Sequence, residues 1–288
     1  MARSSPAILD DDEEIDLASF MLGACGLDYG DFFLDERILT RENFEKNFKF
    51  LRKMVESRSF RRAPYFVIGY FILITGAEMP EDLRRDIIEA AKFKHERGCW
   101  FSKRHEIERK IYLEDFREKI SAYKSGQKLH PIQLIYFNGE SNLYTKYRSE
   151  VVIGLNKFRE LCETGEISKI KHILLQGWGL KTIPTQIFDL MELESLSLEH
   201  NLINQIPENI SNLTLLKDLY LGYNEIKTFP ESLIKVPSLE FLSLNNNFIS
   251  SIPKEIINFK SLKELFIRVN NISELPNYLK SSKFKIEV

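Results

Sequence analysis

Residues 193–215 read LESLSLEHNLINQIPENISNLTL, and residues 216–238 read LKDLYLGYNEIKTFPESLIKVPS. The two stretches align without a gap, because leucine, asparagine, isoleucine and proline recur at matching offsets in both. The pattern continues in rows that begin at residues 170, 239 and 262, so five rows of 23 residues follow one another. Nine positions keep their register through the rows, which indicates a repeat architecture.

Each part of the repeat has a structural reason. The Leu-x-Leu centre, as at Leu196 and Leu198, predicts a short strand whose alternate side chains point inward. Asn201 and its equivalents follow the strand, where the amide can bond backbone groups of the turn and form a ladder. Pro207 and its equivalents suit the first position of a helical or 3₁₀ turn on the outer side. In the first row Trp178 replaces the asparagine, which indicates a modified terminal repeat.

The pattern LxxLxLxxNxLxxLPxxIxxLxx over residues 170–288 resembles the leucine-rich-repeat family. Its 23-residue form is similar to the repeats of intracellular scaffolds of the Ras-suppressor and Scribble kind. The resemblance implies an α/β solenoid of parallel strands whose concave face binds another protein. It also suggests partners among signalling proteins, such as small GTPases, kinases or phosphatases, although no residue selects among them.

Both ends of a solenoid need a cover, because an open end exposes core and strand backbone. Apolar residues at helical spacing predict a helix over 141–163, with Ser141 as its N-cap and Gly165 as its stop, so that 141–169 caps the first repeat. At the other end Phe284, Ile286 and Val288 alternate like a sixth strand. That edge is thinly capped, which would be explained either by a longer protein of which this chain is a piece or by pairing of two copies into a homodimer through the edge.

The preceding residues predict a mainly helical domain over 15–126, after an acidic flexible tail over 1–14 and before a connector over 127–140. The acidic run 10–14 is expected to be solvated. The apolar run 65–75 fits a buried helix or a strand, and its helical neighbours favour the helix. A further helix is expected from an apolar stripe at helical spacing, formed by Phe44, Phe48, Leu51 and Val55. Two more helices are expected to begin at Pro80 and after Ser102. The last of these helices either contacts two neighbours or breaks near residue 112.

Composition excludes several classes of function. With 40 basic and 42 acidic residues the formal net charge is −2, which gives no support to nucleic-acid binding. The longest apolar run has 11 residues, whereas a membrane-spanning helix needs about 20. Cys25, Cys99 and Cys162 lie far apart without CxxC spacing, which argues against disulfides and zinc. With no apolar segment of the signal-peptide kind at the N-terminus, we expect a cytoplasmic protein.

No motif of nucleotide binding, metalloprotease, serine hydrolase or calcium binding is present, and the five histidines do not cluster at ligand spacing. We therefore expect no catalytic residue, no cofactor and no metal. The alternative is an enzyme with its site in residues 15–126 and repeats that select the substrate. A deep polar pocket around Cys99 or His95 would support that alternative, and a solid apolar core would count against it.

The strand face carries the candidate binding site. Two outward columns are predicted, one through residues 172, 195, 218, 241 and 264 and one through residues 174, 197, 220, 243 and 266. Strands about 4.8 Å apart place the aromatic residues of these columns together, and we expect them to be exposed and ringed by charge, as in a binding hot spot. The other readings are that the aromatics are ordinary strand formers, or that they pack against the chain's own N-terminal domain. We predict an adaptor or scaffold with partner-binding residues Tyr220, Phe241, Phe266, Tyr223, Asp218, Glu199 and Arg268; a self-assembling structural protein is a further alternative.

Overall fold

The computed structural model describes residues 8, 12–57, 62–96, 103–132 and 151–288. The chain divides into two compact units, Met1–Lys146 and Tyr147–Val288. Each unit has its own apolar core.

The described part of the N-terminal unit is helical, which confirms the fold class expected for it. Its α-helices are α1 (Asp12–Ala24), α2 (Tyr29–Leu34), α3 (Arg41–Ser57), α4 (Ala63–Thr75), α5 (Glu81–Ala90) and α6 (Lys103–Ala122), with short 3₁₀ turns η1 (Glu36–Ile38) and η2 (Phe93–His95).

The apolar run 65–75 is helical, as its helical neighbours indicated. It forms most of α4, which lies at the centre of this unit. Helix α4 is apolar on all sides and is packed by α1, α3, α5 and α6. Gly69 permits the close approach of α6, since a Cβ there would lie 2.7 Å from Cζ of Phe116. Gly76 ends α4 in the left-handed conformation, with φ of 76°.

Of the other helix predictions, the stripe on α3 is confirmed and the start of α5 is corrected. The stripe on α3 is buried at Phe44, Leu51 and Val55, as predicted. Pro80 is the N-cap of α5 rather than its first helical residue. Helix α6 runs without a break through residue 112, and Ser102 lies outside the described residues.

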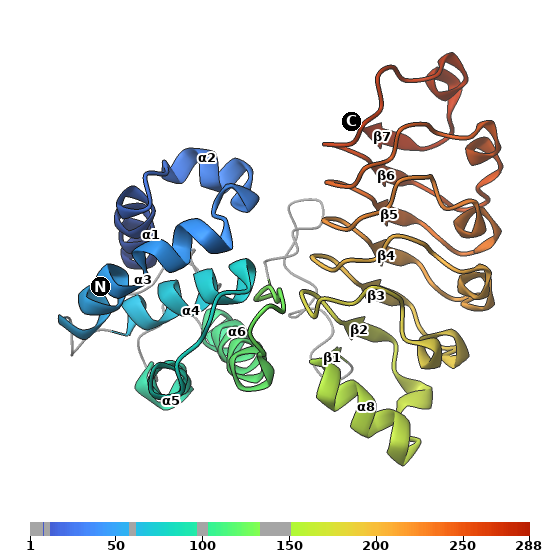
Figure 1. Cartoon of the computed structure of the whole chain (residues 1–288). Coiled ribbons are helices and arrows are strands. Elements are labelled where there is room, and N and C mark those ends of the chain that lie inside the picture. The colour runs from blue at the N-terminus through green and yellow to red at the C-terminus, as the bar shows by residue number, and fades with distance from the viewer. Residues whose placement is uncertain (1–7, 9–11, 58–61, 97–102, 133–150) are drawn as a thin grey trace. The chain divides into compact units, whose positions relative to one another are not determined.

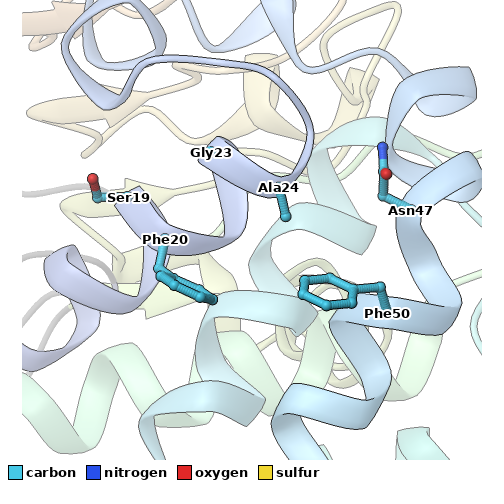
Figure 2. A pocket seen from close by; sticks show the side chains of 6 residues that line it. All are labelled: Ser19, Phe20, Gly23, Ala24, Asn47 and Phe50. Carbon is cyan, nitrogen blue, oxygen red and sulfur yellow. The ribbon is translucent and has the colours of Figure 1, made fainter.

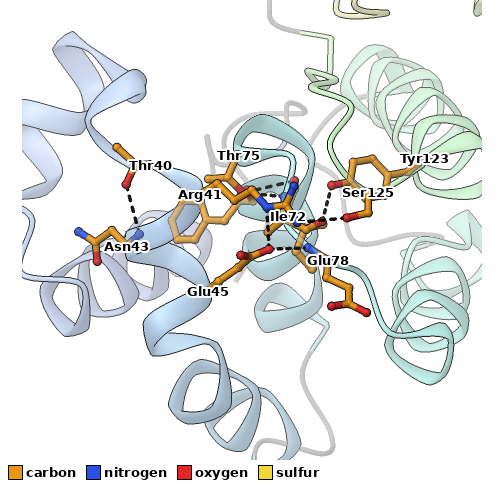
Figure 3. A network of polar contacts seen from close by, with 11 residues as sticks. Thr40, Arg41, Asn43, Glu45, Ile72, Thr75, Glu78, Tyr123 and Ser125 are labelled. Atoms are coloured by element: carbon orange, nitrogen blue, oxygen red, sulfur yellow. Dashed lines mark hydrogen bonds and ion pairs between the residues drawn. The ribbon is translucent and has the colours of Figure 1, made fainter.

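A polar network ties the start of α3 to the end of α4 and to the segment after α6 (Figure 3). Arg41 Nε donates to Glu45 Oε1 at 2.8 Å, and the same oxygen accepts the backbone N–H of Glu78 at 3.1 Å. The Tyr123 hydroxyl donates to the Ala77 carbonyl, and Gly126 N–H donates to the Gly76 carbonyl at 2.9 Å. These bonds satisfy backbone groups that helix ends leave open.

The acidic run was expected to be solvated, and this is wrong for Glu14. The run enters α1, and the side chain of Glu14 is fully buried 2.8 Å from Nη2 of Arg109. Arg109 is also fully buried, and its Nε lies 3.0 Å from Glu96. A buried guanidinium needs carboxylate partners, and Glu14 and Glu96 supply them.

The C-terminal unit is a solenoid of seven parallel strands in the order β1 to β7, with the 3₁₀ turns on the side opposite the strands (Figure 1). Its elements are β1 (Val151–Ile153), α8 (Leu155–Thr164), η3 (Glu166–Lys169), β2 (His172–Leu174), η4 (Thr185–Asp189), β3 (Ser195–Ser197), η5 (Glu208–Asn212), β4 (Asp218–Tyr220), η6 (Glu231–Lys235), β5 (Phe241–Ser243), η7 (Lys254–Asn258), β6 (Glu264–Phe266), η8 (Asn277–Ser281) and β7 (Lys285–Glu287).

The predicted capping helix over 141–163 is wrong at residues 151–153, and residues 141–150 lie outside the described residues. Residues 151–153 form β1, which pairs with β2 in parallel register. The β-branched residues there favour a strand, and Gly154, with φ of 86°, turns the chain before α8. Gly165 ends α8 in the left-handed conformation, as predicted.

The asparagine ladder forms as the repeat predicted. Asn201 Oδ1 accepts the backbone N–H of Trp178 at 3.0 Å and that of Leu180 at 3.1 Å. Its Nδ2 donates to the carbonyls of Leu175 and Leu198, both at 2.8 Å. Each asparagine therefore bonds the backbone of its own row and of the row before it, which fixes the stacking of the repeats.

Candidate protein-binding face of the solenoid

The strand pairing places the two predicted columns in direct register. Parallel pairing aligns His172, Ser195, Asp218, Phe241, Glu264 and Lys285 in one column, and Leu174, Ser197, Tyr220, Ser243, Phe266 and Glu287 in the other. The middle residue of each strand from β2 to β6, such as Leu219 or Leu242, is fully buried in the core. The columns on either side therefore form the outer surface of the sheet.

Three aromatic rings form a line across β4, β5 and β6. The ring centroids of Tyr220 and Phe241 are 5.0 Å apart, and those of Phe241 and Phe266 are 5.1 Å apart. Interplanar angles of 40° and 39° let each ring cover part of its neighbour. The sequence prediction that these residues come together is confirmed.

The expectation that all three rings are exposed is wrong. Tyr220 is 3% exposed and Phe241 is 6% exposed, whereas Phe266 is only partly buried. Neighbouring strands bring large side chains into mutual contact, so residues that point away from the core still lose most of their accessible surface. The accessible end of the aromatic line is therefore at β6.

The predicted charged residues lie in three different environments. Asp218 is partly buried on β4, between Ser195 and Phe241 in the register. Arg268 is exposed just after β6, and its Nη2 lies 2.9 Å from Glu287 on β7. Arg268 follows Phe266 by two residues, so both belong to the accessible end of the face.

The carboxyl of Glu199 is shielded from water, whereas the sequence prediction treated it as a charged group of the binding face. Its Oε2 lies 3.4 Å from Nε2 of buried Gln176, which also donates to Ser197 Oγ at 2.9 Å. Removal of water from the carboxyl raises the pKa of Glu199 to about 7. Near neutral pH this side chain is therefore partly protonated rather than a fixed negative charge.

A column of left-handed residues borders the strand face and was not expected from sequence. His200, Tyr223, Asn246 and Val269 have φ of 54°, 55°, 53° and 54° and occupy equivalent positions before the ladder asparagines. The rings of His200 and Tyr223 stack with centroids 4.2 Å apart and an interplanar angle of 9°. The sequence held one sign of this column. Gly177 occupies the equivalent position in the first row, and glycine adopts a positive φ easily, as it does here. Tyr223, predicted as a binding residue, is 48% exposed on this column.

Of the two residues named for the enzyme alternative, the structure describes His95 alone. His95 is exposed and lies 3.3 Å from Glu89, which also pairs with Lys92 and Lys94. Cys99 lies outside the described residues. Around α4 the described core is largely apolar, but it also encloses buried Arg109, whose guanidinium lies 5.0 Å from the ring centroid of Phe66 on α4. Within the residues described, no helix is both long and apolar enough to cross a membrane.

Comparisons with known proteins agree on the repeats. The family model described as leucine rich repeat matches residues 192–249, and a second model, leucine rich repeats in two copies, matches residues 237–280. No curated protein matches this chain.

Three solved structures illustrate the likeness. One is a leucine-rich-repeat protein of Leptospira interrogans, at 29% identity and TM-score 0.40 over 44% of this chain and 33% of that chain. Another is internalin C2 of Listeria monocytogenes, at 25% identity and TM-score 0.36 over 42% of this chain and 52% of that chain. The third is the plant peptide hormone receptor RGFR1 in complex with RGF2, at 29% identity and TM-score 0.36 over 43% of this chain and 21% of that chain. The matched region thus spans between a fifth and about half of these proteins.

Proposed function

We propose, on the premise that the C-terminal unit is a leucine-rich-repeat solenoid, that this chain is an adaptor that binds a partner protein through its strand face. The repeats support a general role in protein interaction. The adaptor role, a signalling partner and a cytoplasmic location are the finer parts of the proposal.

The observation that carries the proposal is the aromatic line on β4 to β6, with centroid spacings of 5.0 and 5.1 Å. Binding hot spots combine a packed aromatic cluster with a rim of polar groups. Tyr220 and Phe241 supply a packed floor, and Phe266 is the ring that a partner reaches. Exposed Tyr223 and Arg268 stand at the rim.

Charge on this face differs between its two ends. Glu199 and Asp218 lie toward β3 and β4, whereas the end at β6 and β7 carries both signs, with Glu264 and Glu287 beside Lys285 and Arg268. A partner that places an acidic group over Arg268 gains complementarity there, and it competes with Glu287 for the guanidinium. The raised pKa of Glu199 reduces the negative charge at the β3 end near neutral pH.

The test is affinity capture from native lysate with the full chain as bait, beside a Phe266→Ala variant. Phe248→Ala is the matched control, because Phe248 is 38% exposed and lies outside the strands. The proposal requires a captured protein that is lost with Phe266→Ala and retained with Phe248→Ala. Equal capture by all three baits would place the binding surface elsewhere.

A further inference from the structure

A shallow groove runs between α1 and α3 of the N-terminal unit (Figure 2). Its residues come from two neighbouring turns of each helix, and they are Ser19, Phe20, Gly23, Ala24, Asn47 and Phe50. The aromatic residues among them are exposed, with Phe20 at 60% and Phe50 at 53%. In Figure 2 the methyl group of Ala24 points toward the space between these two rings.

The core of this unit does not use these rings. Helix α1 packs inward through Leu17, Met21 and Leu22, and Phe20 lies on its other face. Two exposed phenylalanines at one groove are costly for a free surface, since each leaves a large apolar area in water. The groove also has open space, because a Cβ added at Gly23 meets no atom within 4 Å.

The two walls carry opposite charges. On α1, exposed Asp16 stands one helical turn before Phe20 and therefore on the same face. On α3, exposed Lys46 and Lys53 stand one turn before and one turn after Phe50. A ligand in the groove therefore meets an acid on one side, bases on the other and aromatic rings between them.

We propose that this groove binds an amphipathic helix of a partner protein. The helix places an apolar stripe between Phe20 and Phe50, acidic side chains toward Lys46 and Lys53, and a basic side chain toward Asp16. Both walls are helices whose backbone groups bond internally, so an extended peptide would find no strand edge to pair with. A helix satisfies its own backbone and needs only side-chain contacts. This proposal is independent of the strand face of the solenoid.

Gly23 offers a matched pair of variants. Gly23→Trp fills the open space above α1 without meeting a neighbouring atom at Cβ, and Gly23→Ala leaves the groove open. Both replace glycine inside a helix, where its loss is not destabilising. Phe33→Ala controls for exposed aromatic surface elsewhere, since Phe33 is 78% exposed and does not line the groove.

The experiment selects a phage-displayed library of helical peptides, about four turns long, on the full chain. Selected peptides are expected to share an apolar stripe with acids on one flank, and to bind Gly23→Ala and Phe33→Ala like wild type. Binding to Gly23→Trp should weaken at least tenfold, with circular dichroism confirming its fold. Three outcomes would overturn the proposal. The library gives no enriched peptide, or the selected peptides bind Gly23→Trp as well as wild type. In the third, the mass of wild type without peptide rises with concentration and that of Gly23→Trp does not, which would make a second copy of this chain the occupant.

Discussion

Glu199 should make the stability of the solenoid depend on pH in an unusual direction. Desolvation raises the pKa of its carboxyl from 4.5 to about 7. Between pH 4.5 and about 7 the folded state therefore keeps a proton that the unfolded state has released. Below pH 4.5 both states are protonated and the carboxyl costs nothing. As pH rises toward 7 the unfolded state ionises first, so this group lowers the free energy of unfolding over that window.

The magnitude follows from the shift. One pKa unit corresponds to about 1.4 kcal/mol, so a rise from 4.5 to about 7 costs on the order of 3 kcal/mol above neutral pH. Glu199→Gln keeps the shape and the contact with Gln176 but cannot ionise. The variant should therefore gain on the order of 3 kcal/mol over wild type at pH 8 and almost nothing at pH 4.5.

The assay is urea unfolding followed by tryptophan fluorescence. The chain has two tryptophans, so a Trp100→Phe background leaves Trp178 in the solenoid as the reporter. Wild type and Glu199→Gln are compared at pH 4.5, 6 and 8, within the window of the shift. Equal stability of the two proteins at pH 8, or a gain of the same size at pH 4.5, would refute the assignment of a desolvated carboxyl.

Three further predictions follow from the contacts of the two units. Asn224→Ala should lower the free energy of unfolding by about 2–4 kcal/mol, since the buried amide bonds four backbone groups; Asn270→Ala, at a partly exposed rung, should cost less, and equal losses in urea unfolding would contradict the ladder account. Arg109→Met should destabilise the N-terminal unit by about 3–5 kcal/mol, and adding Glu14→Gln should recover part of that in thermal unfolding; no recovery would argue against the buried pair. If two copies pair through β7, the mass in sedimentation should rise with concentration for wild type and stay that of a monomer for Ile286→Pro; Lys285 and Glu287 make the backbone bonds to β6, so the backbone N–H of Ile286 faces the open edge while its side chain packs on the core, and a wild-type monomer at all concentrations would contradict the pairing.

The repeat made the solenoid predictable in detail. Because its period is constant, the residues that stand side by side could be read from the sequence, and the pairing of Asp218 with Phe241 follows that reading. Burial could not be read in the same way. Whether Tyr220 is exposed depends on the volume of the side chains around it, which the period does not encode.

Irregular contacts were outside the reach of sequence reasoning. Strand β1 lacks the repeat pattern. Apolar residues at helical spacing on both sides of it led to the prediction of a helix there instead of a strand. The bond between Arg109 and Glu14 joins residues 95 positions apart, with no local signal at either end. The left-handed column was detectable only at Gly177, because at His200, Tyr223 and Val269 the side chain gives no hint of a positive φ.

The strand face as a protein-binding surface is tested most directly by the affinity of the captured partner. Isothermal titration of that partner with the full chain, with Phe266→Ala and with Phe248→Ala gives three dissociation constants under one set of conditions. The dissociation constant is expected to be about 10- to 100-fold higher for Phe266→Ala, as for a hot-spot residue, and unchanged for Phe248→Ala. An unchanged affinity for Phe266→Ala would mean that the partner does not bind at the strand face.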